Sequence, residues 1–170
     1  AQLLSTAHRL LDGRETEGKS KTGRKAKRWI LDDAREPVVY QATHLNHPSA
    51  VWVRQSVENY CWLVEHMFGL MDEYTFRYGK KHKCSGDLSY MLQSPPKNLK
   101  DWDRTPMACA MDKKYIISND PLTNYRNYYK IGKSKMSQEE KNDKYFDLSA
   151  ANEELLRKYY DDKYSVEKQG

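Results

Sequence analysis

Basic residues interleaved with aromatic ones are the strongest chemical signal in this sequence of 170 residues. Lys and Arg side chains neutralise phosphates, and aromatic rings stack on bases. The clusters therefore favour nucleic-acid binding, and the alternative is that they are solvated loops and helix ends. The three clusters are Arg24-Lys25-Lys27-Arg28, Lys80-Lys81-His82-Lys83 and Arg126-Lys130-Lys133-Lys135, the last among Tyr125, Tyr128 and Tyr129.

Two histidines, His44 and His47, precede the best-defined predicted helix in the run THLNHPS. With His82 and Cys84 they could supply the three or four ligands that a zinc site requires. Alternatively His47 caps the helix and His44 lies at the surface, or the pair acts on phosphate or protons near neutral pH. A metal nuclease that uses His44, His47 and His82 is thus an alternative function, although we predict no bound metal.

The polar side of the same helix carries Arg54, Asn59, Glu73 and Arg77. One interpretation is a solvated face with pairs at i,i+4. The other is a cleft in which a Glu73–Arg77 ion pair orients a site. No P-loop, G-x-G-x-x-G or G-x-S-x-G motif occurs, so we predict no cofactor and assign no catalytic residue.

Charge is distributed unevenly along the chain, whose formal net charge is +5. Residues 1–136 contain 23 basic and 15 acidic residues, whereas residues 137–170 contain 6 and 9. We therefore predict a helical domain over 1–136 and a charged helical tail over 137–170. A basic body favours a polyanionic partner.

No apolar run approaches the roughly 20 residues that span a bilayer, which excludes a membrane-spanning protein. The sequence shows no signal peptide. Three scattered cysteines, Cys61, Cys84 and Cys109, do not form a disulfide framework. We therefore predict a cytoplasmic protein with reduced thiols and no membrane partner.

The apolar spacing predicts mostly helices. Residues 1–11 have one apolar face. Pro48 begins a long helix over residues 49–78, either as one piece or as two pieces kinked near Gly69. Further helices are predicted over 84–93, from Pro121 to about 136 behind a cap at Asn119 or Asp120, and from about 149.

Less regular structure is expected between the first two helices. Residues 13–28 are polar and basic and predict a flexible loop, while residues 29–40 predict a short hairpin or two extended pieces. The predicted fold class is mainly α: a single compact helical domain with a long central helix, a basic loop or small hairpin near the N-terminus, and a charged helical tail.

Four separated blocks resemble a phage-type family of mostly unassigned function, frequent in viruses of marine bacteria and cyanophage-like. The blocks are AQLLSTAHRLLDG, THLNHPSAVWVRQSVENYCWL, DEYTFRYGKKHK and DPLTNYRNYY, all within residues 1–135. That family is in turn distantly similar to pyrimidine-dimer DNA glycosylases with AP-lyase activity. The similarity lies in the helix order, the long central helix and the aromatic segment at residues 124–129.

The resemblance implies a DNA-binding protein related to base-excision repair enzymes. In those enzymes an N-terminal amine attacks the sugar C1′ of the damaged nucleotide, assisted by a glutamate early in the first helix. Both groups would precede Ala1, and Glu15 and Glu17 do not match the glutamate. Enzymatic activity is therefore left open.

We expect the chain to bind duplex DNA in a host-cell cytoplasm. A non-enzymatic accessory protein that binds a host protein through the acidic tail is the alternative. The predicted DNA contacts are His44, His47, Arg54, Lys80, Lys81, His82, Lys83, Arg126, Tyr128, Tyr129 and Lys130.

Overall fold

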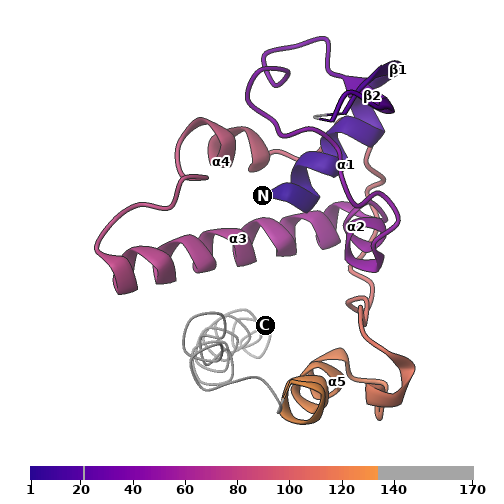
Figure 1. The fold of residues 1–170 in the computed structure, drawn as a ribbon. Coiled ribbons are helices and arrows are strands. Elements are labelled where there is room, and N and C mark those ends of the chain that lie inside the picture. Colours follow the sequence, from indigo (N-terminus) through magenta and orange to yellow (C-terminus); the bar gives the residue numbers. More distant parts are fainter. Residues whose placement is uncertain (21, 134–170) are drawn as a thin grey trace, which may run out of the picture. The chain divides into compact units, whose positions relative to one another are not determined.

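The structure, a computed structural model, describes residues 1–20 and 22–133 (Figure 1). The chain divides into two compact units, Ala1–Ala110 and Met111–Gly170. The predicted boundary between residues 136 and 137 and the predicted helix from about residue 149 lie outside the described residues.

A layer of short elements packs on one long helix in the first unit. α1 lies across α3, the β1–β2 hairpin follows the far end of α1, and α4 lies on the same side of α3 as α1 (Figure 1). The core contains apolar side chains from all four helices, including Leu4, Val53, Tyr60, Met67 and Leu92. The elements are α1 (Gln2–Asp12), β1 (Arg14–Lys19), β2 (Lys25–Ile30), α2 (Pro48–Val53), α3 (Val57–Tyr78) and α4 (Asp87–Leu92).

The region predicted as a polar loop is an antiparallel hairpin. β1 pairs with β2 in a register that sets Arg14 opposite Ile30 and Lys19 opposite Lys25. Ion pairs join the strands diagonally, Lys25 with Glu17 and Lys27 with Glu15, and Trp29 is buried, so the hairpin forms without an alternating apolar pattern. Residues 29–40 form neither the predicted short hairpin nor the alternative two extended pieces, because of these residues only Trp29 and Ile30 belong to a strand, β2, and residues 33–39 form turns.

The long helix predicted from residue 49 is broken before Ser56. Ser56 accepts a hydrogen bond from the Asn59 N–H at 3.1 Å and is the N-cap of α3. The Val57 N–H donates instead to the Lys100 carbonyl, which prevents a continuous helix from α2. α3 continues through Gly69, so the alternative of two pieces that meet there is wrong, and it ends at Gly79, whose φ of 63° suits glycine. Helix α4 confirms the short helix predicted within residues 84–93.

A fully buried arginine fastens α1 to the rest of the first unit. The Arg9 guanidinium donates to the carbonyls of Trp29, Glu36, Val39 and Tyr40 and to the Glu36 carboxylate. Each guanidinium nitrogen therefore has a partner, which is the condition for burying a charge at acceptable cost. The bonds fix the turns after β2 against α1.

The second unit begins with a short helical turn and is organised by one buried asparagine. The side-chain oxygen Oδ1 of Asn124 accepts from the backbone N–H groups of Ile117 and Ser118. The side-chain nitrogen Nδ2 of Asn124 donates to the Ser118 carbonyl. Asp120 caps α5 by accepting from the N–H groups of Leu122 and Thr123, which confirms one of the two predicted caps. The elements are η1 (Lys113–Tyr115), α5 (Pro121–Asn127) and the π-helical turn η2 (Tyr128–Gly132).

The predicted class of a single compact, mainly helical domain is therefore wrong. Of the described residues 45% are helical, only one of the described helices is long, and a two-stranded antiparallel sheet is present. It also divides into two units rather than one. Among the helices that the structure describes, none combines the length and apolarity needed to cross a membrane.

Replacing Arg9 with Met should lower the free energy of unfolding by about 3–5 kcal/mol, because it leaves buried carbonyls and a carboxylate without their donor. Urea unfolding followed by circular dichroism measures the change. The control is Arg14→Met, which removes an exposed guanidinium 3.8 Å from Asp32 and should cost less than about 1 kcal/mol. Equal costs for the two variants would contradict a structural role for Arg9.

Candidate nucleic-acid interface and a buried polar pocket

The predicted contacts around α2 are used within the protein. His47 is the N-cap of α2, and its Nδ1 accepts from the Ser49 N–H at 3.2 Å. Arg54 donates to the Leu45 carbonyl at 2.9 Å, and its burial lowers its pKa. His44 has a left-handed backbone with a φ of 53° and is exposed beside Thr43. His44 and His47 are both exposed, whereas Arg54 is half-buried.

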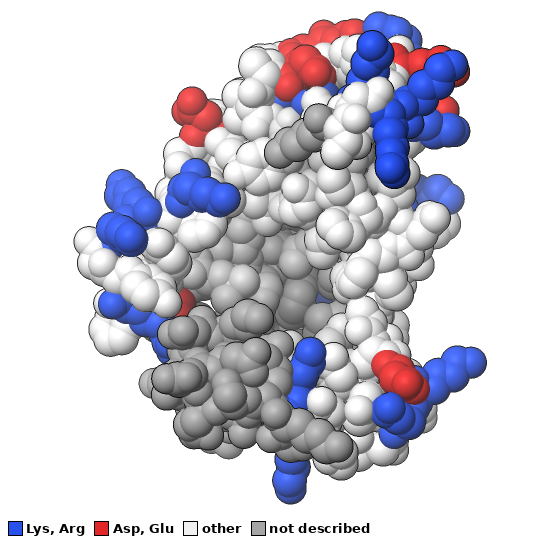
Figure 2. Space-filling model, viewed as in Figure 1, with Lys and Arg blue, Asp and Glu red and all other residues white. Residues whose placement is uncertain are grey.

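The lysine turn, defined as Lys80, Lys81 and Lys83, follows α3 directly and is exposed. In the part of the chain that the structure describes, no carboxylate lies within 4.0 Å of any of these three ammonium groups. Basic side chains gather at the edge of the first unit where α3 ends (left in Figure 2). The turn therefore presents three positive charges to solvent.

His82, within the same turn, has a structural role. Its Nδ1 accepts from the Cys84 N–H at 3.2 Å. Its ring makes a T-shaped contact with the Tyr74 ring, with the two ring centroids 4.9 Å apart. Cys84 is itself buried in the core. The lysine turn is thus anchored between α3 and the segment that leads to α4.

Lys25 and Lys27 of the hairpin differ from the lysine turn because each has a carboxylate within 4.0 Å. Lys27 lies 2.7 Å from Glu15, and Lys25 lies 4.0 Å from Glu17. Figure 2 accordingly shows basic and acidic side chains intermixed at the top of the view. Two of the four residues of the first basic cluster thus have a carboxylate within 4.0 Å, whereas Arg24 and Arg28 have none among the described residues.

The remaining predicted contacts lie in the second unit. Arg126, Tyr129 and Lys130 are exposed. The Tyr128 ring packs on the Tyr115 ring, with the two centroids 5.0 Å apart. The Lys133 ammonium also lies over Tyr128, at 5.5 Å from its centroid. Tyr129 is thus the more accessible of the two tyrosines predicted to stack on bases.

The described residues form neither the metal site nor the cleft along the long helix that the sequence offers as alternatives. Within residues 1–20 and 22–133, no three His, Cys, Asp or Glu side chains are grouped so that they could hold a metal. Asn59 is buried and bonds to Trp52 and Thr105, while Glu73 and Arg77 form an ion pair of 2.7 Å. At 1.5 Å per residue, Asn59 and Arg77 are about 27 Å apart along α3, too far for one cleft.

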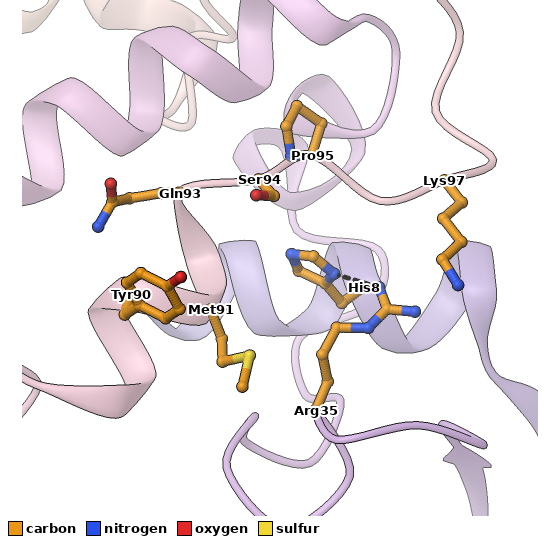
Figure 3. Close-up of a pocket in the computed structure, with 8 residues that line it drawn as sticks. All are labelled: His8, Arg35, Tyr90, Met91, Gln93, Ser94, Pro95 and Lys97. Carbon is orange, nitrogen blue, oxygen red and sulfur yellow. Dashed lines mark hydrogen bonds between the residues drawn. The ribbon is translucent and has the colours of Figure 1, made fainter.

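The structure contains a pocket of about 340 Å³ in the first unit that sequence reasoning missed (Figure 3). His8 and Arg35 form its polar wall, and α4 and the segment after it supply the rest. The residues come from separate parts of the chain, so no local spacing could reveal them. The lining consists of His8, Arg35, Tyr90, Met91, Gln93, Ser94, Pro95 and Lys97.

The hydrogen bonds around His8 define its tautomer. The Tyr60 hydroxyl donates to the Leu92 carbonyl at 2.9 Å, so it accepts from His8 Nε2 at 2.7 Å. The proton is therefore on Nε2, and Nδ1 accepts from an N–H of Arg35 at 2.7 Å (Figure 3). Both ring nitrogens are occupied, so His8 offers no lone pair to a metal or a substrate.

Charges around the pocket are balanced internally. Arg35 donates to Asp12 at 2.6 Å and to Asp33 at 2.7 Å, and the hydrogen bonds with Asp33 raise the pKa of Arg35. Hydrogen bonding from Arg35 lowers the pKa of Asp33. Burial would raise the pKa of Asp12, but donors from Arg35, Lys97 and Asn98 outweigh it and lower the pKa. The network fixes the segment after α4 onto α1.

Comparison with known proteins finds no matching family model, no matching curated protein and no matching solved structure. The resemblance to phage-type proteins and to pyrimidine-dimer glycosylases therefore stays a prediction.

Acidification should destabilise the protein through His8. Burial, followed by the charge of Arg35, lowers the pKa of His8 from 6.5 to about 4 in the folded state. The unfolded chain therefore takes up this proton first, so stability is complete above pH 6.5 and declines as the pH falls toward 4. The difference corresponds to about 3 kcal/mol, and Asp12 and Asp33 contribute in the same direction at lower pH.

The measurement is the unfolding free energy of wild type and His8→Gln between pH 7 and pH 4.5. We expect the variant to be less stable at pH 7 and to have a shallower slope, by up to about 1.4 kcal/mol per pH unit. Burial also lowers the pKa of His66, so the slope should not vanish. The control, His44→Gln, changes an exposed ring and should keep the wild-type slope; an unchanged slope in His8→Gln would refute the assignment.

Proposed function

We propose that this protein binds DNA through the lysine turn at the end of α3. The observation that carries the proposal is that Lys80, Lys81 and Lys83 are exposed and have no carboxylate within 4.0 Å among the described residues, whereas Lys25 and Lys27 of the hairpin have one each. Cations without internal partners can displace the counterions of a phosphate backbone and gain affinity by doing so.

The second unit supports the same function by its composition and exposure. Arg126, Lys130 and Tyr129 combine two exposed cations with an exposed ring on a short helical segment. Such a combination suits a phosphate contact together with a contact to a base. The proposal therefore assigns phosphate contacts to both units.

The resemblance to repair glycosylases gives the proposal its substrate preference. We propose duplex DNA as the polyanion and a preference for damaged over intact duplex, in a host-cell cytoplasm. The described residues carry no assigned catalytic group, so the proposed function is binding, and lesion cleavage is not part of it.

Replacing Lys80, Lys81 and Lys83 together with Gln should weaken DNA binding and flatten its salt dependence. Loss of three phosphate contacts should make the slope of log affinity against log salt less steep by about 2–3. Fluorescence anisotropy of a labelled duplex, intact and ultraviolet-damaged, across a salt series measures both quantities.

The matched control is the triple variant Arg14→Gln, Lys25→Gln and Lys27→Gln, which removes the same charge from residues that lie within 4.0 Å of carboxylates. It should change the slope by less than half as much. Equal effects of the two triple variants would show that only net charge matters and would remove the lysine turn from the interface.

A further inference from the structure

We infer that Tyr78 is a stacking platform for an unpaired base and that the DNA bound at the lysine turn has locally unpaired bases. The inference rests on the proposed function, because it assigns a substrate class to the same turn. It commits to one ligand, a DNA strand with at least one base outside a base pair.

The Tyr78 ring is exposed but held in place. Its side chain is 59% accessible, in the last turn of α3. On one side it packs on Tyr74, with ring centroids 4.7 Å apart, and Tyr74 in turn meets the His82 ring edge-on at 4.9 Å. An aromatic ring fixed in this way loses little conformational freedom when a base stacks on it.

The rings and the lysine turn belong to one rigid feature. Gly79, in the left-handed conformation, turns the chain directly after Tyr78, and the lysines follow. His82 both supports Tyr74 and accepts from the Cys84 N–H, so the aromatic row is tied to the turn that carries the charges. A strand whose phosphates contact the lysines therefore passes beside the Tyr78 ring.

The geometry favours unpaired DNA for a simple reason. In an intact duplex both faces of each base are covered by neighbouring bases, so a protein ring can reach a face only after a base leaves the stack. The cost of that step is absent or small where the base is already unpaired. Stacking then adds affinity on top of the electrostatic attraction, which both paired and unpaired strands provide.

The neighbouring Phe76 provides an internal comparison. It is 86% accessible and lies in the same helical turn, but two residues correspond to about 200° of rotation, so it points to the opposite side of α3. None of the described ring contacts involves Phe76, in contrast to Tyr78. It is more exposed than Tyr78 but has no aromatic support.

The test uses the full chain and three labelled DNAs of one length and one salt concentration: a single strand, an intact duplex, and the duplex with one bulged nucleotide. We expect Tyr78→Ala to weaken binding of the single strand and of the bulged duplex by about 5- to 100-fold, the range for losing one stacked base. Binding of the intact duplex should change less than twofold. Tyr78→Trp should retain the wild-type affinity, and Phe76→Ala should change it less than twofold.

The two proposals fail in distinguishable ways. If the Lys80, Lys81 and Lys83 variant weakens binding but Tyr78→Ala affects all three DNAs equally, the stacking platform is refuted and the lysine turn is retained. If Phe76→Ala weakens binding as much as Tyr78→Ala, the preorganised row is not the platform. If the lysine variant leaves all affinities unchanged, the proposed function itself is wrong.

Discussion

The buried guanidinium of Arg9 is the constraint on which the first unit depends. The segment after β2 has no ladder or helix to pair its carbonyl groups, and Arg9 supplies donors to the carbonyls of Glu36, Val39 and Tyr40 from within α1. Buried backbone groups need such partners. Once this segment is fixed, Arg35 lies against His8 and Asp12, and the polar wall of the pocket follows. One charged side chain therefore organises about ten residues that have no regular structure.

Histidines in this chain serve mainly as acceptors. Nδ1 of His8 accepts from Arg35, Nδ1 of His47 from the Ser49 N–H, and Nδ1 of His82 from the Cys84 N–H. A nitrogen that accepts a hydrogen bond in the native structure cannot at the same time donate its lone pair to a metal. His47 and His82 are candidate zinc ligands in the sequence. In the structure their Nδ1 atoms instead accept hydrogen bonds from backbone N–H groups.

Basic residues divide into two groups with different physical roles. Arg9 and Arg35 are buried or nearly so, satisfied by carbonyls and carboxylates, and hold the fold together. The lysines after α3 are exposed, with no carboxylate nearby among the described residues. The first group loses its hydration on burial, and hydrogen bonds within the protein replace it. The second group keeps its hydration, which a bound polyanion can displace. The exposed lysines after α3 are accessible to a ligand, as are Arg126 and Lys130 of the second unit, whereas the Arg9 side chain is buried.

The sequence by itself determined the features that depend on neighbouring residues. The cap at Asp120, the end of α3 at Gly79 and the exposed lysines that follow it could all be read locally, because caps and helix ends involve residues within a few positions of each other. Tertiary structure decided the rest. The hairpin needs β1 and β2 to pair their polar residues, and the gap between α2 and α3 depends on the bond from Val57 to Lys100. The pocket network joins His8 to partners 27 and 52 residues away. Such pairings leave no periodic trace in the sequence, because they follow from how the elements pack and not from the preferences of single segments.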